Sequence, residues 1–172
     1  MNIPDEPVLG PDFERSSDPV ASQPDVGERI GRLLASQPFG VLCAQGWGQP
    51  YGAVVAFAYV PELSALAFST PVATRKFRLL EESAHVALVI DSRSLHPEDM
   101  MQVEAVTATG FAAQLEDPEV RREWSRRIGE RHAYLRAFLK SPSTAVFRID
   151  VFRYFYVTRF QEVTQWVPPR IG

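Results

Sequence analysis

Three consecutive residues with the chemistry to hold an anion, Thr74, Arg75 and Lys76, separate two different patterns. The preceding run "ALAFST" is typical of a strand, whereas "RKFRLLEES" has helical spacing, so we expect the three residues at the start of a helix. Backbone N–H groups there lack partners within the helix, and the positive end of the helix dipole favours an anion. Thr74 can cap the helix or donate its hydroxyl to the anion, and Arg75 can donate two hydrogen bonds to phosphate oxygens.

The alternative interpretation of these residues is a solvated basic pair on a helix surface. The helix dipole disfavours cations at the N-terminus of a helix, so we expect these two residues to have a function other than stabilising the helix. Binding of a terminal phosphate is such a function. Each charge-assisted hydrogen bond contributes about 1.5–3 kcal/mol, so three or four of them would hold a phosphorylated cofactor firmly.

The rest of the chain predicts one domain that positions these residues. Its 172 residues, 45% of them hydrophobic, are enough for one substantial core but short for two independent domains. Residues 1–24 contain prolines among acidic and small residues, and we predict a disordered or draped N-terminal arm. Residues 25–172 then form the domain, beginning with a helix in "DVGERIGRLLASQ".

Short apolar runs separated by glycine and proline predict a β-rich fold after that helix. The runs "FGVLCAQ", "YGAVVAFAYV" and "ALAFST" indicate a three-stranded antiparallel meander, and "HVALVID" indicates a fourth strand. Two further strands, "QVEAVTATGFAAQLE" and "STAVFRIDVFRYFYVTRFQEV", flank one helix, "PEVRREWSRRIGERHAYLRAFL". Mostly short connections favour an α+β fold, a six-stranded antiparallel barrel with flanking helices, over a doubly wound parallel sheet.

Charge and composition exclude several classes of partner. A formal net charge of -3 argues against a general affinity for nucleic acid or an anionic membrane. The single cysteine, Cys43, excludes an intramolecular disulfide, and we expect it to be a small buried residue of a strand. The three histidines lack the spacing of a metal pair, so no metal site is expected. The absence of a leader pattern and of a membrane-length apolar stretch predicts a cytoplasmic protein.

Other polar residues are given local roles. His132 is expected to be a packed or capping helix residue, whereas His96, in the loop "SRSLHPEDMM", could move a proton if it lay near a cofactor. Asp91 and Arg93 predict a mutual salt bridge, with a dimer or cofactor contact as the second choice. The arginines of residues 118–131 alternate with glutamates, which favours a solvated, salt-bridged face.

The segments "PYGAVVAFAYV", "ALAFSTPVATRKFRLLEESAHVALVIDSR" and "AVTATGFAAQL" together resemble the pyridoxamine 5'-phosphate oxidase-like FMN-binding split barrels. The resemblance spans roughly Ile30 to Val163, and its most specific piece contains Thr74, Arg75 and Lys76. It implies a six-stranded antiparallel split β-barrel and a homodimer with FMN at the subunit interface.

By position, the resemblance also implies a set of cofactor-binding residues. The two residues that end the third strand would meet the edge of the flavin ring, and the three at the helix start would hold the phosphate. Part of residues 53–57 would lie along the ring face, while alternate positions of that strand face the barrel core. The implied cofactor-binding residues are Val54, Val55, Ser69, Thr70, Thr74, Arg75 and Lys76.

Departures from the family pattern argue against the vitamin B6 oxidase itself. The oxidases carry basic residues where this chain has Ala53 and Ala58, and a glutamine where it has Glu104 or Ala105. Their C-terminal arginine and histidine motif has no match in "RFQEVTQWVPPRIG". The resemblance is therefore to an uncharacterised branch, in which Trp166 and Arg170 are candidate lid residues.

The leading hypothesis is an FMN-dependent oxidoreductase in which the flavin transfers a hydride or electrons and the protein supplies position and a dry pocket. No catalytic side chain, substrate or electron donor is assigned. The alternatives are a non-catalytic flavin-binding sensor or carrier, and a relative that binds deazaflavin or haem. The phosphate-binding pattern favours FMN over haem, because haem has no phosphate.

Overall fold

Seven strands and four α-helices follow one another in the computed structural model, which describes residues 24–159 and 162–169. The predicted N-terminal arm lies outside the described residues, except for Pro24, where the first helix begins. The strands are β1 (Phe39–Gly46), β2 (Gln49–Tyr59), β3 (Ala65–Pro71), β4 (His85–Asp91), β5 (Ala105–Gln114), β6 (Thr144–Thr158) and β7 (Glu162–Trp166). The helices are α1 (Pro24–Ser36), α2 (Arg75–Glu82), α3 (Pro118–Arg131) and α4 (Arg136–Leu139). Short 3-10 turns are η1 (Arg93–Leu95), η2 (Met100–Gln102) and η3 (Ala133–Leu135).

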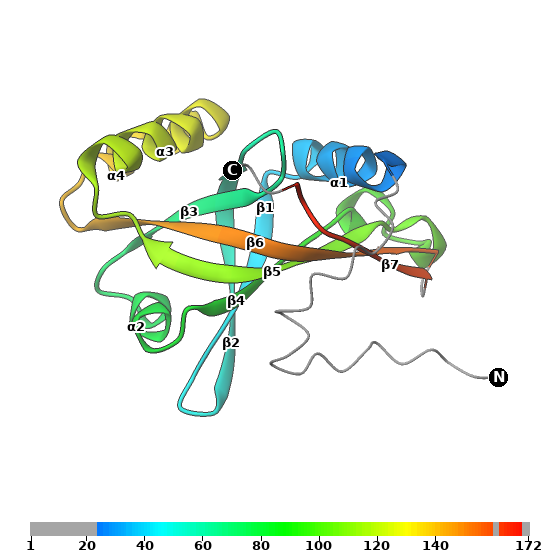
Figure 1. Ribbon diagram of the computed structural model, residues 1–172, viewed down its shortest axis with the longest axis horizontal. Coiled ribbons are helices and arrows are strands. Elements are labelled where there is room, and N and C mark those ends of the chain that lie inside the picture. The colour runs from blue at the N-terminus through cyan, green and yellow to red at the C-terminus, as the bar shows by residue number, and fades with distance from the viewer. Residues whose placement is uncertain (1–23, 160–161, 170–172) are drawn as a thin grey trace.

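Six of the strands close a barrel in the order β3-β2-β1-β4-β5-β6, and β6 pairs again with β3. All neighbouring pairs are antiparallel. The predicted meander is β1-β2-β3, and the predicted six-stranded antiparallel split β-barrel with flanking helices is confirmed. In Figure 1, α1 and α3 lie along the upper side of the barrel, and α2 lies below them beside the protruding β1–β2 hairpin.

The last predicted strand is in fact two strands. The sequence pattern indicated one strand over residues 143–163, but β6 ends at Thr158 and β7 begins at Glu162. Arg159 has a positive φ of 47°, and β7 folds back to pair with the end of β6. The prediction was wrong because no glycine or proline marks this turn, and apolar residues continue on both sides of it.

The predicted helix over residues 118–139 is also interrupted. Helix α3 ends at Arg131, and His132, with φ -130° and ψ 77°, leaves the helical conformation before η3 and α4. The imidazole of His132 lies inside the protein, where its Nε2 is 2.8 Å from the carbonyl oxygen of Phe57. A long-range hydrogen bond therefore replaces the helical continuation that the local pattern predicts.

Two apolar clusters hold the barrel and its helices together. The larger one fills the barrel with alternate strand residues and is closed at one end by α1. The residues that α1 contributes are spaced for one helical face, namely Val26, Ile30, Leu33 and Leu34. The smaller cluster packs Trp124 and Ile128 of α3 on Ala58, Ala65 and Ala67 of the sheet. Small alanine side chains let the helix approach the outer face of β2 and β3.

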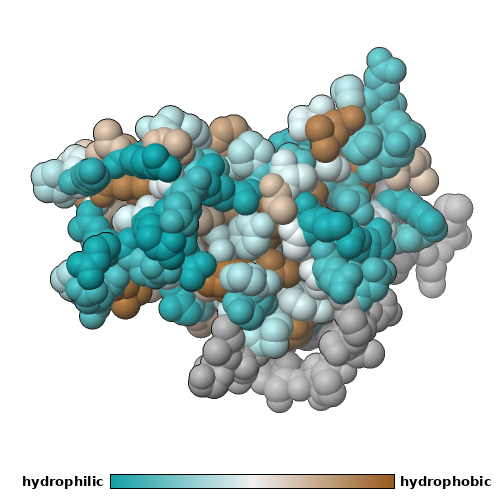
Figure 2. Space-filling model, turned by 90° about the horizontal axis from the view of Figure 1, so that it is seen from above, coloured by the Kyte–Doolittle hydropathy of each residue, from teal (hydrophilic) through white to brown (hydrophobic). Residues whose placement is uncertain are grey.

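Outside that contact, α3 carries the predicted salt-bridged face. Arg126 donates to Glu123 at 2.8 Å and to Glu130 at 2.6 Å, and Arg127 donates to Glu123 at 2.9 Å. Figure 2, seen from above, shows hydrophilic residues covering most of the α3 end of the molecule. These arginines are therefore engaged by neighbouring carboxylates.

Candidate functional site

The predicted anion-binding residues lie where β3 leads into α2. Thr74 is the N-cap of α2, because its Oγ1 accepts a hydrogen bond from the backbone N–H of Phe77 at 3.2 Å. The same hydroxyl donates to the carbonyl of Pro71 at 2.9 Å and lies 3.1 Å from the hydroxyl of Thr70. The proton of Thr74 is therefore used within the protein, and of the two roles considered for this residue the structure shows the cap.

Arg75 and Lys76 are the first two residues of α2, where backbone N–H groups have no intrahelical acceptor. The exposed guanidinium of Arg75 lies 5.3 Å from the ring centroid of Tyr51, on the neighbouring hairpin. Lys76 is half-buried, and desolvation lowers the pKa of its ammonium group. Within residues 24–159 and 162–169, neither cation forms an ion pair. Both remain able to meet an anion.

A pocket of about 220 Å³ opens beside Lys76. It is lined by Phe39, Val54, Val55, Ala56, Ser69, Lys76, Tyr134, Leu135 and Phe138. The fold thus brings four predicted residues to one pocket, from β2, β3 and α2. The other three predicted residues, Thr70, Thr74 and Arg75, do not line it. Thr70 is fully buried behind Thr74.

The two predicted strand residues face opposite sides of β2. Val54 points outward with 70% of its surface exposed, whereas Val55 is 4% exposed and belongs to the barrel core. A contact of Val55 with a cofactor would therefore involve its main chain. The roles of these residues as ligands remain predictions from the resemblance.

The far wall of the pocket consists of residues that sequence reasoning missed. Phe39 comes from the start of β1, where it pairs with Ala56, and Tyr134, Leu135 and Phe138 come from η3 and α4. The aromatic residues of the segment "HAYLRAF" were the only feature of the sequence that could have indicated a pocket wall. The prediction of one helix over residues 118–139 did not place this segment at the pocket, because the interruption at His132 is what brings it to the sheet.

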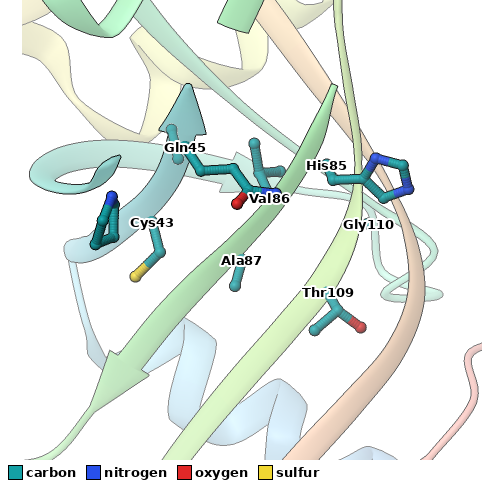
Figure 3. Close-up of a pocket in the computed structure, with 9 residues that line it drawn as sticks. Cys43, Gln45, His85, Val86, Ala87, Thr109 and Gly110 are labelled. Carbon is teal, nitrogen blue, oxygen red and sulfur yellow. The ribbon is translucent and has the colours of Figure 1, made fainter. Parts of the chain in front are cut away.

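Figure 3 shows a second pocket, of about 300 Å³, on the outer face of β1, β4 and β5. Cys43, Ala87 and Thr109 are paired across these strands, and their side chains share that face. Cys43 is exposed, so the prediction of a buried cysteine was wrong: its position in the alternating pattern points outward. Partial desolvation raises the pKa of its thiol, which disfavours a nucleophilic thiolate.

The remaining candidates are distributed over other parts of the fold. Arg93 and Asp91 form the predicted salt bridge at 3.2 Å, and His96 ends η1. Trp166 of β7 packs on the core, with its ring centroid 5.8 Å from that of Tyr154. Arg170 lies outside the described residues. His132 is packed, as predicted.

No group of three or more His, Cys, Asp and Glu side chains in the described part of the chain could hold a metal ion. None of its helices combines the length and hydropathy of a membrane span.

The family model described as pyridoxamine 5'-phosphate oxidase matches residues 26–158. The sequence matches no curated protein significantly. A haem-binding protein from Mycobacterium smegmatis has a similar structure, with a TM-score of 0.73 and 17% identity over 82% of this chain and 57% of the other. The present chain thus spans little more than half of that protein.

Two other similar structures are matched over most of their length. The haem storage protein HutZ from Vibrio cholerae has a TM-score of 0.64 and 16% identity over 82% of this chain and 93% of the other. General Stress Protein 26 from Bacillus anthracis has a TM-score of 0.61 and 18% identity over 81% of this chain and 98% of the other. At these identities the likeness concerns the fold alone.

Proposed function

Because the chain belongs to the pyridoxamine 5'-phosphate oxidase family, we propose that it is an FMN-binding flavoprotein and acts as an oxidoreductase on a small substrate. One observation carries the proposal: Lys76, at the start of α2, lines a pocket whose other walls are mostly apolar and carry no carboxylate. A flavin mononucleotide has the matching shape, because a charged phosphate is joined to a planar, largely apolar ring.

The residues present fit this cofactor. Arg75, Lys76 and the first backbone N–H groups of α2 would hold the phosphate, and no carboxylate lines the pocket to oppose it. Val54 and Ser69 would lie against the ring. When bound, the flavin supplies hydride or electron transfer, while these residues bind it, orient it and exclude water.

We propose that a second copy of the chain covers the outer face of β1 and β2. Val54 is 70% exposed and Phe39 is 48% exposed, and both line the 220 Å³ pocket as well as a neighbouring pocket of about 370 Å³. Large apolar side chains gathered on one face are typical of an interface. A homodimer would bury Val54 and would place FMN between the subunits.

Sedimentation of the wild type and of two variants tests the dimer. The wild type should have the mass of two chains, and Val54→Glu should shift it towards one chain because a carboxylate would be buried. The control, Val120→Glu, changes an apolar residue that is 38% exposed on α3 and should leave the mass unchanged. Equal masses for all three proteins would contradict the proposed interface.

The first test of the cofactor is an absorption spectrum of the native protein, with mass spectrometry of the molecule released on heating. A flavin spectrum and released FMN are expected. A colourless protein that does not take up added FMN would overturn the proposal. Reduction of the bound flavin by NADH or NADPH, followed by stopped flow, would separate an enzyme from a non-catalytic sensor or carrier.

Haem is the second candidate ligand, because two of the similar structures are described as haem-binding or haem storage proteins. In this chain His85 belongs to the lining of the outer pocket of Figure 3, but its imidazole packs edge-on against Phe111, with ring centroids 4.5 Å apart. The pocket beside Lys76 has no histidine, cysteine or methionine in its lining, which favours FMN there. A Soret band would identify haem, and the released mass would identify a deazaflavin.

A single cysteine suits a reducing compartment, and we propose the cytoplasm.

A further inference from the structure

Two aromatic residues of the pocket beside Lys76 contact one buried histidine. The ring of Phe39 lies nearly parallel to the imidazole of His132, with centroids 6.2 Å apart and 16° between the planes. The ring of Tyr134 meets the same imidazole edge-on, with centroids 5.9 Å apart and 71° between the planes. Both aromatic residues line the pocket, although they are 95 positions apart in the sequence, counted from 39 to 134.

His132 is held firmly enough to orient both rings. His132 is only 3% exposed. Its Nε2 lies 2.8 Å from the carbonyl oxygen of Phe57, and because a carbonyl oxygen only accepts, Nε2 is the donor of this hydrogen bond. Its backbone N–H donates to Ile128 at 2.8 Å, and its carbonyl accepts from Leu135 at 2.9 Å. The histidine thus connects the end of α3, the turn η3 and the strand β2.

The chemistry of this wall defines what it can recognise. Phe39, Tyr134, Leu135 and Phe138 carry no charge, and the hydroxyl of Tyr134 is the only polar side-chain atom among them. Tyr134 is 66% exposed and Phe39 is 48% exposed, so both rings have surface left for a ligand. Lys76 and Ser69 lie elsewhere in the lining, where the proposed function assigns them to the cofactor.

We propose that Phe39 and Tyr134 form a binding site for the substrate, and that the substrate is a planar, uncharged aromatic molecule. Its ring packs on the two aromatic side chains, and one hydrogen bond to the hydroxyl of Tyr134 orients it. His132 is a positioning residue, because it sets the orientation of both rings without contacting the ligand. The position of this substrate site next to a flavin rests on the proposed function.

Calorimetric binding of 2-methyl-1,4-naphthoquinone to the purified protein, with its FMN content measured in each sample, tests the site. The wild type should bind this ring more tightly than a naphthalene sulfonate of similar size, because the wall offers no cation. Tyr134→Ala should weaken binding roughly 2- to 10-fold, which is the size of one aromatic contact, and Tyr134→Phe, which keeps the ring but loses the hydroxyl, should weaken it less. Leu95→Ala, which changes a residue that is 63% exposed on η1, is the control and should bind like the wild type.

Two results would overturn the site: no quinone binding by the wild type, or equal binding by Tyr134→Ala and the wild type. Failure of the proposed function is a separate outcome. A protein without FMN whose quinone binding still depends on Tyr134 would retain this site and lose the flavin.

The positioning role of His132 has its own readout. His132→Gln keeps an N–H donor for Phe57, whereas His132→Ala does not, so the glutamine variant should bind the quinone nearer to wild-type affinity. Equal quinone binding by the two variants, at equal FMN content, would contradict the positioning role. The exposed Tyr134 variants test the site itself even where a buried His132 variant fails to fold.

Discussion

Two cation-rich regions of this protein use the same side chains in opposite ways. On α3, Arg126 lies between Glu123 and Glu130, at 2.8 and 2.6 Å. At the start of α2, Arg75 and Lys76 form no ion pair with any residue in the described ranges. Arg126 and Arg127 of α3 are neutralised by carboxylates about one turn away, whereas Arg75 and Lys76 have no such partner in the described part of the chain.

The difference shows which cations are available to a ligand. Exposed ion pairs at a spacing of three or four residues contribute little to stability. Because the two charges cancel, they also leave little positive potential to attract an anionic ligand. Unpaired cations at the N-terminus of a helix are opposed by the dipole until an anion arrives. The number of basic residues is therefore a poor guide to an anion site, and the lack of a carboxylate partner is a better one.

The largest expected effect comes from removing the unpaired cations. Arg75→Ala combined with Lys76→Ala should weaken FMN binding at least about 100-fold, because two charge-assisted hydrogen bonds of about 1.5–3 kcal/mol each are lost. Fluorescence titration of the apoprotein with FMN measures this. The matched control, Arg122→Ala with Arg126→Ala on α3, should bind FMN like the wild type. Unchanged affinity in the first variant would disprove the phosphate site.

A buried hydroxyl that shares a carboxylate with a paired cation should affect the stability of the fold. Arg29 of α1 donates to Glu104 at 3.2 Å, and the buried hydroxyl of Tyr156 donates to the same carboxylate oxygen. Burial, together with this hydrogen bond, raises the pKa of Tyr156, so the phenol stays protonated. Tyr156→Phe should lower the free energy of unfolding by about 1–3 kcal/mol, as measured in urea. Tyr134→Phe, at an exposed phenol, is the control and should leave the unfolding free energy unchanged; equal losses in both variants would be the contrary result.

The affinity for FMN should fall in alkaline solution. Desolvation lowers the pKa of Lys76 from 10.5, so in the free protein its ammonium loses the proton at a lower pH than an ordinary lysine does. Once it is neutral it no longer attracts the phosphate, and the dissociation constant should therefore rise as the pH increases through this lowered pKa. Lys76→Arg should remove most of this rise because a guanidinium stays charged. The same pH dependence in both proteins would assign it to another group.

The smallest effect is expected on α3. The hydrogen bond from Arg126 lowers the pKa of Glu123, so its stabilising contribution is present above the pKa of the unfolded chain and is lost as the pH falls through the folded pKa. Glu123→Gln should lower the melting temperature at neutral pH by no more than about two degrees, because the pair is exposed. The two melting temperatures should converge in acid. A large loss of stability, or a loss of bound FMN, would contradict the interpretation of this face as a solvated, salt-bridged surface.

Much of the fold followed from local patterns. Alternating apolar residues and glycine or proline turns predicted the meander, and helical spacing after Thr74 predicted α2 together with its cap. The placement of Arg75 and Lys76 at the first turn follows from the same few residues. These features were predictable because strand alternation, helix capping and tight turns depend on neighbours in the sequence.

Only the tertiary structure decided which side chains complete the pocket. A hydrogen bond between residues 57 and 132 ends α3 and brings Tyr134 to the wall that contains Phe39. The outward position of Cys43 likewise depends on pairing with a distant strand, because Cys43 of β1 pairs with Ala87 of β4. Local sequence encodes the elements, but contacts between residues far apart along the chain select which alternative each ambiguous segment adopts.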